Sequence, residues 1–588
     1  MKGLQVAIYT KINLKVVISI LWGCCCLSSV VVANTFDSSI KPTGLNKSDL
    51  SQPNVVFIAI DDLKAGSGAI TPNIDAIAKG GVRFTQAYAQ QAICGPSRAS
   101  VLTGTRPDTT GVIHNYIKFR DKYPDIITLP QHFSAHGYNT SYVGKIFHHG
   151  DKDDKLSWNW PAVQTIPNQI AKPRRYALSI NQQQQIANKK IMKLRYGEQA
   201  KFGLGSGPAF EKAKVADTAY KDGYNAQLAI LTIQELTEQS HKPFFFGFGL
   251  NKPHLPWVAP QKYWDLYQNH DIELTTLRAP PKNGASVGLH SSFELRTFSN
   301  IPKKGPINDT LAIELKHAYL ASVSYVDAQI GKLIRALESQ NIMQNTIIVL
   351  WSDHGYHIGE MGIWGKASNY ETATRVPLII STPETRKNPK SVTSQALVEL
   401  VDLYPTLTEL AGFSAPVITQ GKSMVPLLEN PNQIWKQAAF SQFPTPALRE
   451  WGAYPLRKGM RETYFGPLLQ QVETQIQHQF KHNQHATKIN EWNRELFEKF
   501  LMGYAMRTSQ YRIIAWKDHR DPQLSPLFVE VFDHHQDPHE TVNIAELKPD
   551  LTTALLAQLK ETWPNSSVSS IEQNKGRINS VDTINKDH

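Results

Sequence analysis

Cysteine is almost absent from this chain of 588 residues, which contains only four. Cys24, Cys25 and Cys26 are adjacent in an apolar segment near the N-terminus, so Cys94 stands alone in the rest of the sequence. A single cysteine cannot form an intrachain disulfide, and one thiol makes a poor metal site. Cys94 is therefore either a buried structural thiol or the nucleophile, or nucleophile precursor, of an active site.

Long apolar runs are also scarce, and the clearest lies at the N-terminus. Three lysines and no acid precede or enter an apolar run at residues 16–27, and small residues follow as far as Ala33. This order is typical of a secretory signal peptide, so we expect residues 1–33 to be removed and the protein to be exported, periplasmic or secreted. The alternatives are an uncleaved membrane anchor and a lipid attached at Cys24. The run is short for a span, and we expect no stable membrane span elsewhere.

Dense tracts of Lys and Arg are missing, although the formal net charge is +11. Removal of residues 1–33, which contain three lysines and no acid, lowers this charge to +8. We therefore expect no nucleic-acid partner, whereas a modest basic excess suits an acidic substrate or a polyanion. An exported chain without disulfides must rely on its hydrophobic core. This requirement favours a large bacterial periplasmic enzyme over a small secreted scaffold.

Apolar runs recur along the chain and are separated by helical patterns. They occupy residues 54–60, 139–143, 243–250, 346–351 and 377–381. Continuous apolar runs of this length are typical of strands that are buried on both faces of a parallel sheet. Apolar residues spaced by three and four predict a helix over 315–337. The pattern indicates an α/β domain with a large, mainly parallel sheet sandwiched by helices.

Changes in composition divide the chain into parts. After the signal peptide we predict a linker (34–52), a main domain (53–430), a smaller C-terminal α+β subdomain (431–565) and a polar tail (566–588), which we expect to be disordered. Alternation at 511–516 and 528–532 predicts a small antiparallel sheet in the subdomain. The irregular stretch 151–215 is predicted to be a surface excursion that borders a substrate cleft.

Side chains that could bind a metal ion or take part in catalysis follow four of the predicted strands directly. They are Asp61 and Asp62, then Lys145 and His148, then Lys252 and His254, and finally Asp353 and His354. Taken singly, each has a structural reading, because acids cap turns and a lone histidine is often only hydrogen-bonded. Ligands of open α/β sheets bind beyond the carboxyl ends of the strands, so the coincidence favours a site. Three converging carboxylates would repel one another unless a hard cation such as Ca²⁺ or Mg²⁺ held them.

The sequence around Cys94 makes this hypothesis specific. Cys94-Gly95-Pro96-Ser97-Arg98, continued through Gly104, resembles the signature of the formylglycine-dependent sulfatases, which are type I sulfatases of the alkaline phosphatase superfamily. In that family a maturation enzyme oxidises the cysteine to an aldehyde, formylglycine. The resemblance spans residues 53–430. Segments 144–148, 252–254 and 359–366 are further similar to the iduronate-2-sulfatase branch.

The resemblance implies a role for each matching residue. The metal ligands would be Asp61, Asp62, Asp353, His354 and the converted Cys94, and the ion would be Ca²⁺, with Mg²⁺ as the alternative. Of the aldehyde hydrate's two hydroxyls, one would attack sulfur and the other would later expel sulfate. The remaining catalytic residues would be Arg98, Lys145, His148, His254 and Lys366. Lysines would hold sulfate oxygens, His254 would protonate the leaving alcohol, and His148 would be the base.

These implications define the expected function and its competitors. We expect an alkaline-phosphatase-like fold and removal of O-sulfate from a sugar residue of a sulfated glycan. The partners would be a sulfated oligosaccharide and a formylglycine-generating enzyme. The substrate could instead be a fragment of an algal sulfated polysaccharide. A phosphonate or phosphodiester hydrolase, or a non-catalytic glycan-binding protein on the same fold, are the other hypotheses.

Overall fold

The computed structural model describes residues 52–148, 155–167, 171–196, 207–303, 305–444, 474, 495–520 and 525–564. The predicted signal peptide (1–33), the predicted tail (566–588) and all of the predicted linker (34–52) except its last residue lie outside the described residues. Within the described ranges, no helix combines the length and apolar character needed to cross a membrane.

The predicted α/β architecture is confirmed by a central sheet of eight strands. These strands are β1 (Asn54–Asp61), β2 (Val82–Tyr88), β3 (Asn139–Gly144), β5 (Phe244–Pro253), β7 (Thr346–Ser352), β10 (Arg375–Ser381), β11 (Val392–Ser394) and β12 (Val398–Glu399). The order is β11-β2-β10-β7-β1-β5-β3, and β12 also pairs with β2. Only β10 runs antiparallel to its neighbours, so the sheet is mostly parallel.

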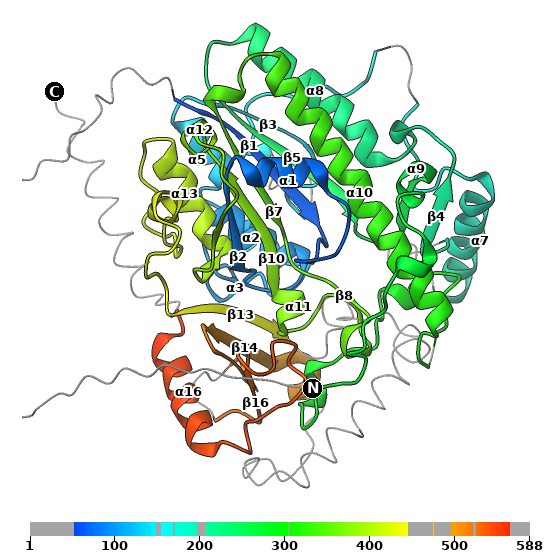
Figure 1. The fold of residues 1–588 in the computed structure, drawn as a ribbon, viewed down its shortest axis with the longest axis vertical. Coiled ribbons are helices and arrows are strands. Elements are labelled where there is room, and N and C mark those ends of the chain that lie inside the picture. The colour runs from blue at the N-terminus through cyan, green and yellow to red at the C-terminus, as the bar shows by residue number, and fades with distance from the viewer. Residues whose placement is uncertain are drawn as a thin grey trace, which may run out of the picture. The chain divides into compact units, whose positions relative to one another are not determined.

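Helices cover both faces of this sheet, and β1 shows why. Alternate side chains of a strand point to opposite faces. Val56, Ile58 and Ile60 join a core with helices α1 (Pro72–Lys79), α8 (Lys221–Gln239) and α10 (Asp309–Ser339). The intervening side chains join a second core with α2 (Cys94–Thr103), α5 (Leu129–Ala135) and α13 (Leu403–Leu410). Figure 1 shows α8 and α10 on one side of the sheet and α5 and α13 on the other. Burial on both faces explains the continuous apolar run.

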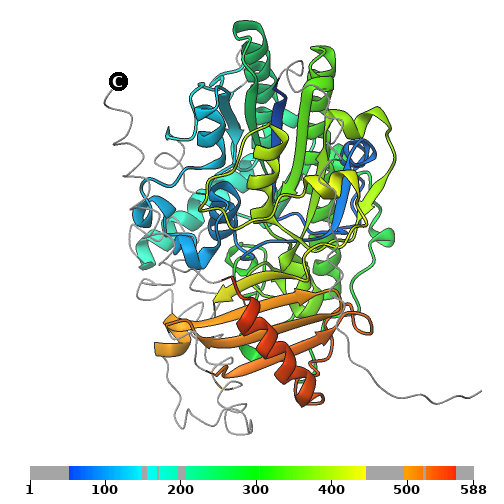
Figure 2. The same cartoon turned by 90° about the vertical axis from the view of Figure 1, so that its left-hand side faces the viewer.

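A second, antiparallel sheet follows in the C-terminal part. It contains β13 (Ala438–Pro444), β14 (Leu501–Thr508), β15 (Tyr511–Asp518) and β16 (Phe528–Asp533) in that order. Helix α16 (Pro549–Thr562) packs on one face of it, as Figure 2 shows. On the other face, Ile514 and Trp516 share a core with Ile93 and Ala367. These last two residues are the neighbours of Cys94 and Lys366, so this sheet supports the region where the sequence predicts the site.

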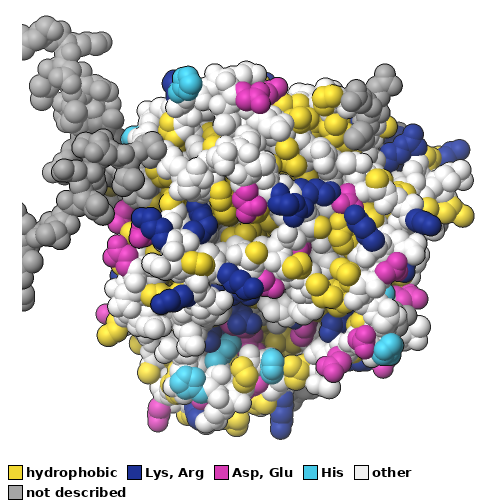
Figure 3. All heavy atoms as spheres, turned by 45° about the horizontal axis from the view of Figure 1, so that its top comes forward, with side chains coloured by type: hydrophobic (Ala, Val, Ile, Leu, Met, Phe, Trp, Pro, Cys, Tyr) yellow, Lys and Arg dark blue, Asp and Glu magenta, His cyan; other side chains and the backbone are white. Residues whose placement is uncertain are grey.

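Further strands and helices complete the described fold, and all of them are short except α7. The strands are β4 (Phe210–Ala213), β6 (Trp257–Pro260), β8 (His357–Ile358) and β9 (Trp364–Gly365). The helices are α3 (Pro107–Thr110), α4 (Phe119–Lys122), α7 (Ser179–Tyr196), α9 (Gln261–Trp264), α11 (Glu371–Thr374), α12 (Pro383–Lys387) and α14 (Val425–Glu429). On the face drawn in Figure 3, Lys and Arg side chains lie across the middle among apolar and acidic ones.

Candidate active site

The ends of four parallel strands bring the predicted residues to one edge of the central sheet. Asp61 ends β1, and Asp353 with His354 follows β7 directly. Lys145 follows β3, and His254 follows β5. Because β3, β5, β1 and β7 are adjacent and parallel, their carboxyl ends lie side by side. This is the edge at which open α/β sheets bind ligands.

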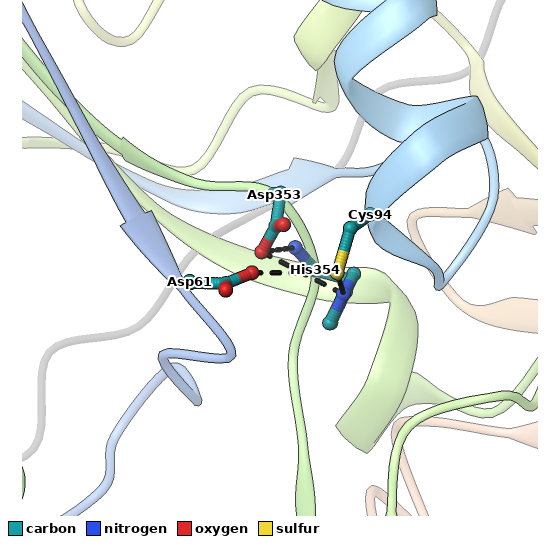
Figure 4. Close-up of side chains that lie close together, drawn as sticks. All are labelled: Asp61, Cys94, Asp353 and His354. Atoms are coloured by element: carbon teal, nitrogen blue, oxygen red, sulfur yellow. Dashed lines mark hydrogen bonds and ion pairs between the residues drawn. The ribbon is translucent and has the colours of Figure 1, made fainter. Parts of the chain in front are cut away.

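Cys94 begins helix α2 and faces this edge. Its Sγ lies 3.3 Å from Oδ1 of Asp61 and 3.4 Å from Nε2 of His354. Figure 4 shows Asp61, Cys94, Asp353 and His354 converging from β1, α2 and the end of β7. The ligand atoms of these four residues all lie within 4.8 Å of one another. The thiol therefore sits among oxygen and nitrogen ligands.

The residues after Cys94 position it. The hydroxyl of Ser97 donates to the carbonyl of Asp353 at 2.5 Å, and the amide of Gly95 donates to Oδ1 of Asn115 at 2.8 Å. A Cβ on Gly95 would lie 2.8 Å from that same oxygen, so a side chain would force Asn115 to move. Pro96 occupies the first turn of α2, where a missing N–H costs no helical hydrogen bond.

Arg98 lies between the carboxylates and the chain that follows β3. Its Nε donates to Oδ2 of Asp353 at 2.9 Å, and its Nη2 lies 3.4 Å from Oδ1 of Asp61. Its Nη1 donates to the carbonyls of Lys145 and Ile146 at 2.5 and 3.0 Å. Arg98 is fully buried and contacts two carboxylates of the predicted metal site, and its catalytic role stays a prediction.

Two ammonium groups neutralise the other carboxylate oxygens. Nζ of Lys145 lies 2.6 Å from Oδ2 of Asp61, and Nζ of Lys366 lies 2.9 Å from Oδ1 of Asp62. Nζ of Lys366 is also 3.8 Å from Sγ of Cys94. A close backbone approach places Lys145: a Cβ on Gly144 would lie 1.9 Å from the carbonyl oxygen of Gly249, to which the Lys145 amide donates at 3.0 Å. Gly144 also has a φ of +89°, which glycine tolerates best.

Burial and charge shift the pKa values of the site in opposite directions. Burial would raise the pKa of Asp61, but Lys145, His254 and Arg98 hold it well below its usual value. Burial raises the pKa of Asp62 well above its usual value, against the attraction of Lys366, and Asp61 adds repulsion. Burial also raises the pKa of the Cys94 thiol, and the Asp61 carboxylate raises it further. Without a bound cation, both effects favour the protonated form of this thiol.

The donor set fits a hard divalent cation. Asp61, Asp353 and His354 surround Cys94, and Asp62 with His254 forms a second ligand group that shares the same thiol. The two groups therefore describe one centre. Its donors are mainly carboxylate oxygens, which Ca²⁺ and Mg²⁺ prefer, and a cation would offset the repulsion that raises the pKa of Asp62.

Glu294 is a member of this site that the sequence analysis missed. One carboxylate oxygen lies 3.2 Å from Nε2 of His254, and the other lies 3.4 Å from Nζ of Lys366. Burial and Lys366 lower the pKa of His254 well below its usual value. Glu294 lies in an irregular stretch before α10, far from any strand end. Nothing in a single sequence distinguishes it from glutamates that lie on the surface.

His148 is the predicted residue that these contacts do not include. It is partly buried and lies four residues beyond the end of β3, three residues after Lys145. The carbonyls of Lys145 and Ile146, which precede it, accept hydrogen bonds from Arg98. The chain leading to His148 is thus anchored beside the site, and its role stays a prediction.

Comparison with known proteins agrees with this geometry. The sequence model of the Sulfatase family matches residues 53–413. The chain is 28% identical over 562 residues to a sulfatase of Formosa agariphila, covering 91% of this chain and 94% of the relative. It is 29% identical over 484 residues to iduronate 2-sulfatase of Mus musculus, covering 72% and 83%. A solved phosphonate monoester hydrolase from Silicibacter pomeroyi shares the fold with a TM-score of 0.60 and 21% identity, covering 88% and 96%.

These matches confirm the resemblance seen in the sequence, including its similarity to the iduronate-2-sulfatase branch. The family match covers more than half of the chain. The chain belongs to the sulfatase family and is a sulfuric ester hydrolase.

Proposed function

We propose that this protein removes an O-sulfate group from a sugar residue of a sulfated glycan, and that Cys94 is converted to formylglycine before it acts. The observation that carries the proposal is the position of Cys94. Its buried thiol lies 3.3 Å from Asp61 and 3.4 Å from His354, and these surroundings raise its pKa. A thiol with a raised pKa is a weak nucleophile, which supports conversion of this residue before it acts.

Each neighbouring residue has a distinct part in the proposed reaction. The aldehyde hydrate of formylglycine would supply the hydroxyl that attacks sulfur. A divalent cation, for which we propose Ca²⁺, would be bound by Asp61, Asp62, Asp353 and His354. It would stabilise negative charge at the attacked group. Lys145 and Lys366 would bind sulfate oxygens, where negative charge develops in the transition state.

Proton transfer is assigned to the two histidines. His254 lies 3.2 Å from Glu294, whose negative charge would oppose the burial and the Lys366 charge that lower the pKa of His254, and a general acid requires the protonated ring. His254 would donate its proton to the oxygen of the leaving alcohol. After one hydroxyl has taken up the sulfate group, His148 would accept the proton of the other hydroxyl, so that the aldehyde re-forms and sulfate leaves.

The substrate class follows from the relatives. One similar protein is named iduronate 2-sulfatase, which supports a 2-O-sulfated uronate in a glycosaminoglycan fragment. A fragment of an algal sulfated polysaccharide is the alternative. Measuring sulfate release from defined oligosaccharides of both origins would separate the two.

We also propose that residues 1–33 direct export, and sequencing the N-terminus of the mature protein would test this.

A second candidate function is hydrolysis of a phosphonate or phosphodiester. The fold similarity to a phosphonate monoester hydrolase favours it, because these esters also carry one negative charge at the reacting group. Rates on an aryl sulfate and on the matching aryl phosphodiester would decide. An enzyme that hydrolyses only the diester would overturn the sulfatase proposal.

Mass spectrometry of the peptide that contains Cys94 is the direct test of conversion. We expect protein from its native host to show the mass of formylglycine at this position and to lose it in a Cys94→Ala variant. Active protein whose Cys94 is entirely unmodified would contradict the mechanism.

A further inference from the structure

A cavity of about 470 Å³ opens beside the candidate active site. Asp61, Lys145 and His254 line it on the side of the catalytic residues. Arg174, Arg175 and Lys221 line it as well, and all three are exposed to solvent. The cavity therefore leads from the reacting groups to a cationic outer wall.

The three cations of this wall form no ion pair with any acid that the structure describes. Within the described part of the chain, Arg174 donates to the amide oxygen of Gln182 at 2.5 Å, and Lys221 donates to that of Asn251 at 3.2 Å. Arg175 lies over the ring of Phe298 at 5.6 Å. None of these partners is charged.

The two acids that line the cavity, Asp61 and Asp222, interact with groups other than the three cations of the wall. Asp61 pairs with Lys145 at 2.6 Å. Asp222 accepts hydrogen bonds from the backbone amides of Asn251 and Lys252 at 2.8 and 2.9 Å. The positive charges of the wall are thus left to face the cavity.

The segment that carries the two arginines is held in place by one buried carboxylate. Glu211, on β4, accepts hydrogen bonds from the amides of Ala177 and Leu178 at 2.7 and 3.1 Å. The Tyr220 hydroxyl donates to the same carboxylate at 2.7 Å, and the Tyr176 hydroxyl donates to the carbonyl of Pro208 at 2.8 Å. Strand β4 pairs with β6, which follows His254 closely. The wall is therefore attached through β4 to the strand that follows His254.

We propose that Arg174, Arg175 and Lys221 form a subsite for a second oxyanion of the substrate, either a carboxylate or a further sulfate. This inference rests on the proposed function. A sulfate ester carries one negative charge, for which Lys145 and Lys366 already stand at the catalytic end. Three additional unneutralised cations match a second negative group, and guanidinium groups recognise carboxylate and sulfate oxygens in a fork of two hydrogen bonds. The substrate class is then a sugar sulfate that carries at least two negative charges.

The test compares sugar sulfates that differ only in the second anion. One pair is a 2-O-sulfated uronate and its carboxyl methyl ester, and the other is a glucosamine N,6-disulfate and the uncharged-amide analogue N-acetylglucosamine 6-sulfate. The wild type should prefer the doubly charged member of at least one pair, and which pair shows it distinguishes carboxylate from sulfate. In an Arg174→Ala/Arg175→Ala variant this preference in kcat/KM should fall about tenfold or more, mainly through KM.

Lys172→Ala is the matched control, because Lys172 is exposed on the same segment and does not line the cavity. It should keep the wild-type preference. Raising the salt concentration should raise the wild-type KM more for the doubly charged substrate, which tests the subsite even where the double variant does not fold. A preference that is absent in the wild type, or that survives in the double variant, overturns the subsite.

Titration calorimetry of the same ligands separates this inference from the proposed function. A wild-type chain that binds the doubly charged ligands more tightly but hydrolyses none of them would overturn the function and keep the subsite. A wild-type chain that hydrolyses these substrates but binds both members of each pair equally well would overturn the subsite and keep the proposed function.

Discussion

The imidazole of His254 lies 3.2 Å from one carboxylate oxygen of Glu294, and Glu294 is almost fully buried. The second oxygen of that carboxylate lies 3.4 Å from Nζ of Lys366. One acid thus links the proposed general acid to a lysine that contacts Asp62. Its negative charge orients the ring and opposes the burial and the Lys366 charge that lower the pKa of His254.

Replacing Glu294 with Gln keeps the shape and removes this charge. We expect kcat on a sugar sulfate to fall about 10- to 100-fold, because an alcohol leaving group needs a proton. The loss on 4-nitrophenyl sulfate should be much smaller, since nitrophenolate leaves without one. Steady-state rates on the two substrates measure the difference, with exposed Glu273→Gln as the control. Equal losses on both substrates would contradict a role through His254.

Metal content should depend on Asp353. We expect about one divalent ion per chain in the wild type and much less in Asp353→Asn, because the substitution removes a charged ligand atom from the cluster. Elemental analysis measures this directly, and exposed Asp75→Asn is the control. Chelation should also lower the melting temperature, since an ion at 100 times its dissociation constant stabilises the folded state by about 2.7 kcal/mol. Unchanged metal content in Asp353→Asn would place the ion elsewhere.

Arg512 connects the two sheets through buried ion pairs. Its guanidinium lies 2.5 Å from Glu540 and also contacts Glu371, on α11. We expect Arg512→Ala to lower the free energy of unfolding by about 3 kcal/mol, because Glu371 and Glu540 lose their shortest ion pairs and keep only those with Arg507, Arg375 and His534. Arg83→Ala, which breaks the exposed pair with Asp75, should cost less than about 1 kcal/mol. Urea denaturation measures both variants, and similar costs would show that the Arg512 contacts contribute little.

Glu530 should make stability depend on pH. Burial raises its pKa to about 7, although Trp516, Tyr370 and the Ala285 amide donate hydrogen bonds to it. Between pH of about 4.5 and 7 the folded state therefore holds a proton that the unfolded state has lost. The free energy of unfolding should fall across this range in the wild type relative to Glu530→Gln, and the difference should be constant above it.

Denaturation of both proteins at several pH values measures this difference, because the other titrating groups are common to both. A difference that does not change with pH would show that Glu530 stays ionised in the folded protein.

The sequence determined the central fold and most of the candidate site. Its continuous apolar runs identified β1, β3, β5 and β7, because burial on both faces of a parallel sheet selects apolar side chains at every position. Once those strands were recognised, Asp61, Lys145, His254 and Asp353 had to share one edge, since parallel strands end together. The residues around Cys94 then pointed to the family.

Only the tertiary structure decided the rest. Glu294 reaches His254 from an irregular segment, and Arg174 and Arg175 reach the cavity from an excursion held by Glu211. The structure also shows that the guanidinium of Arg98 donates hydrogen bonds to Asp353 and to two backbone carbonyls and contacts Asp61. These positions depend on contacts between residues far apart in the chain. Such contacts leave no local periodicity, so no pattern along the sequence can reveal them.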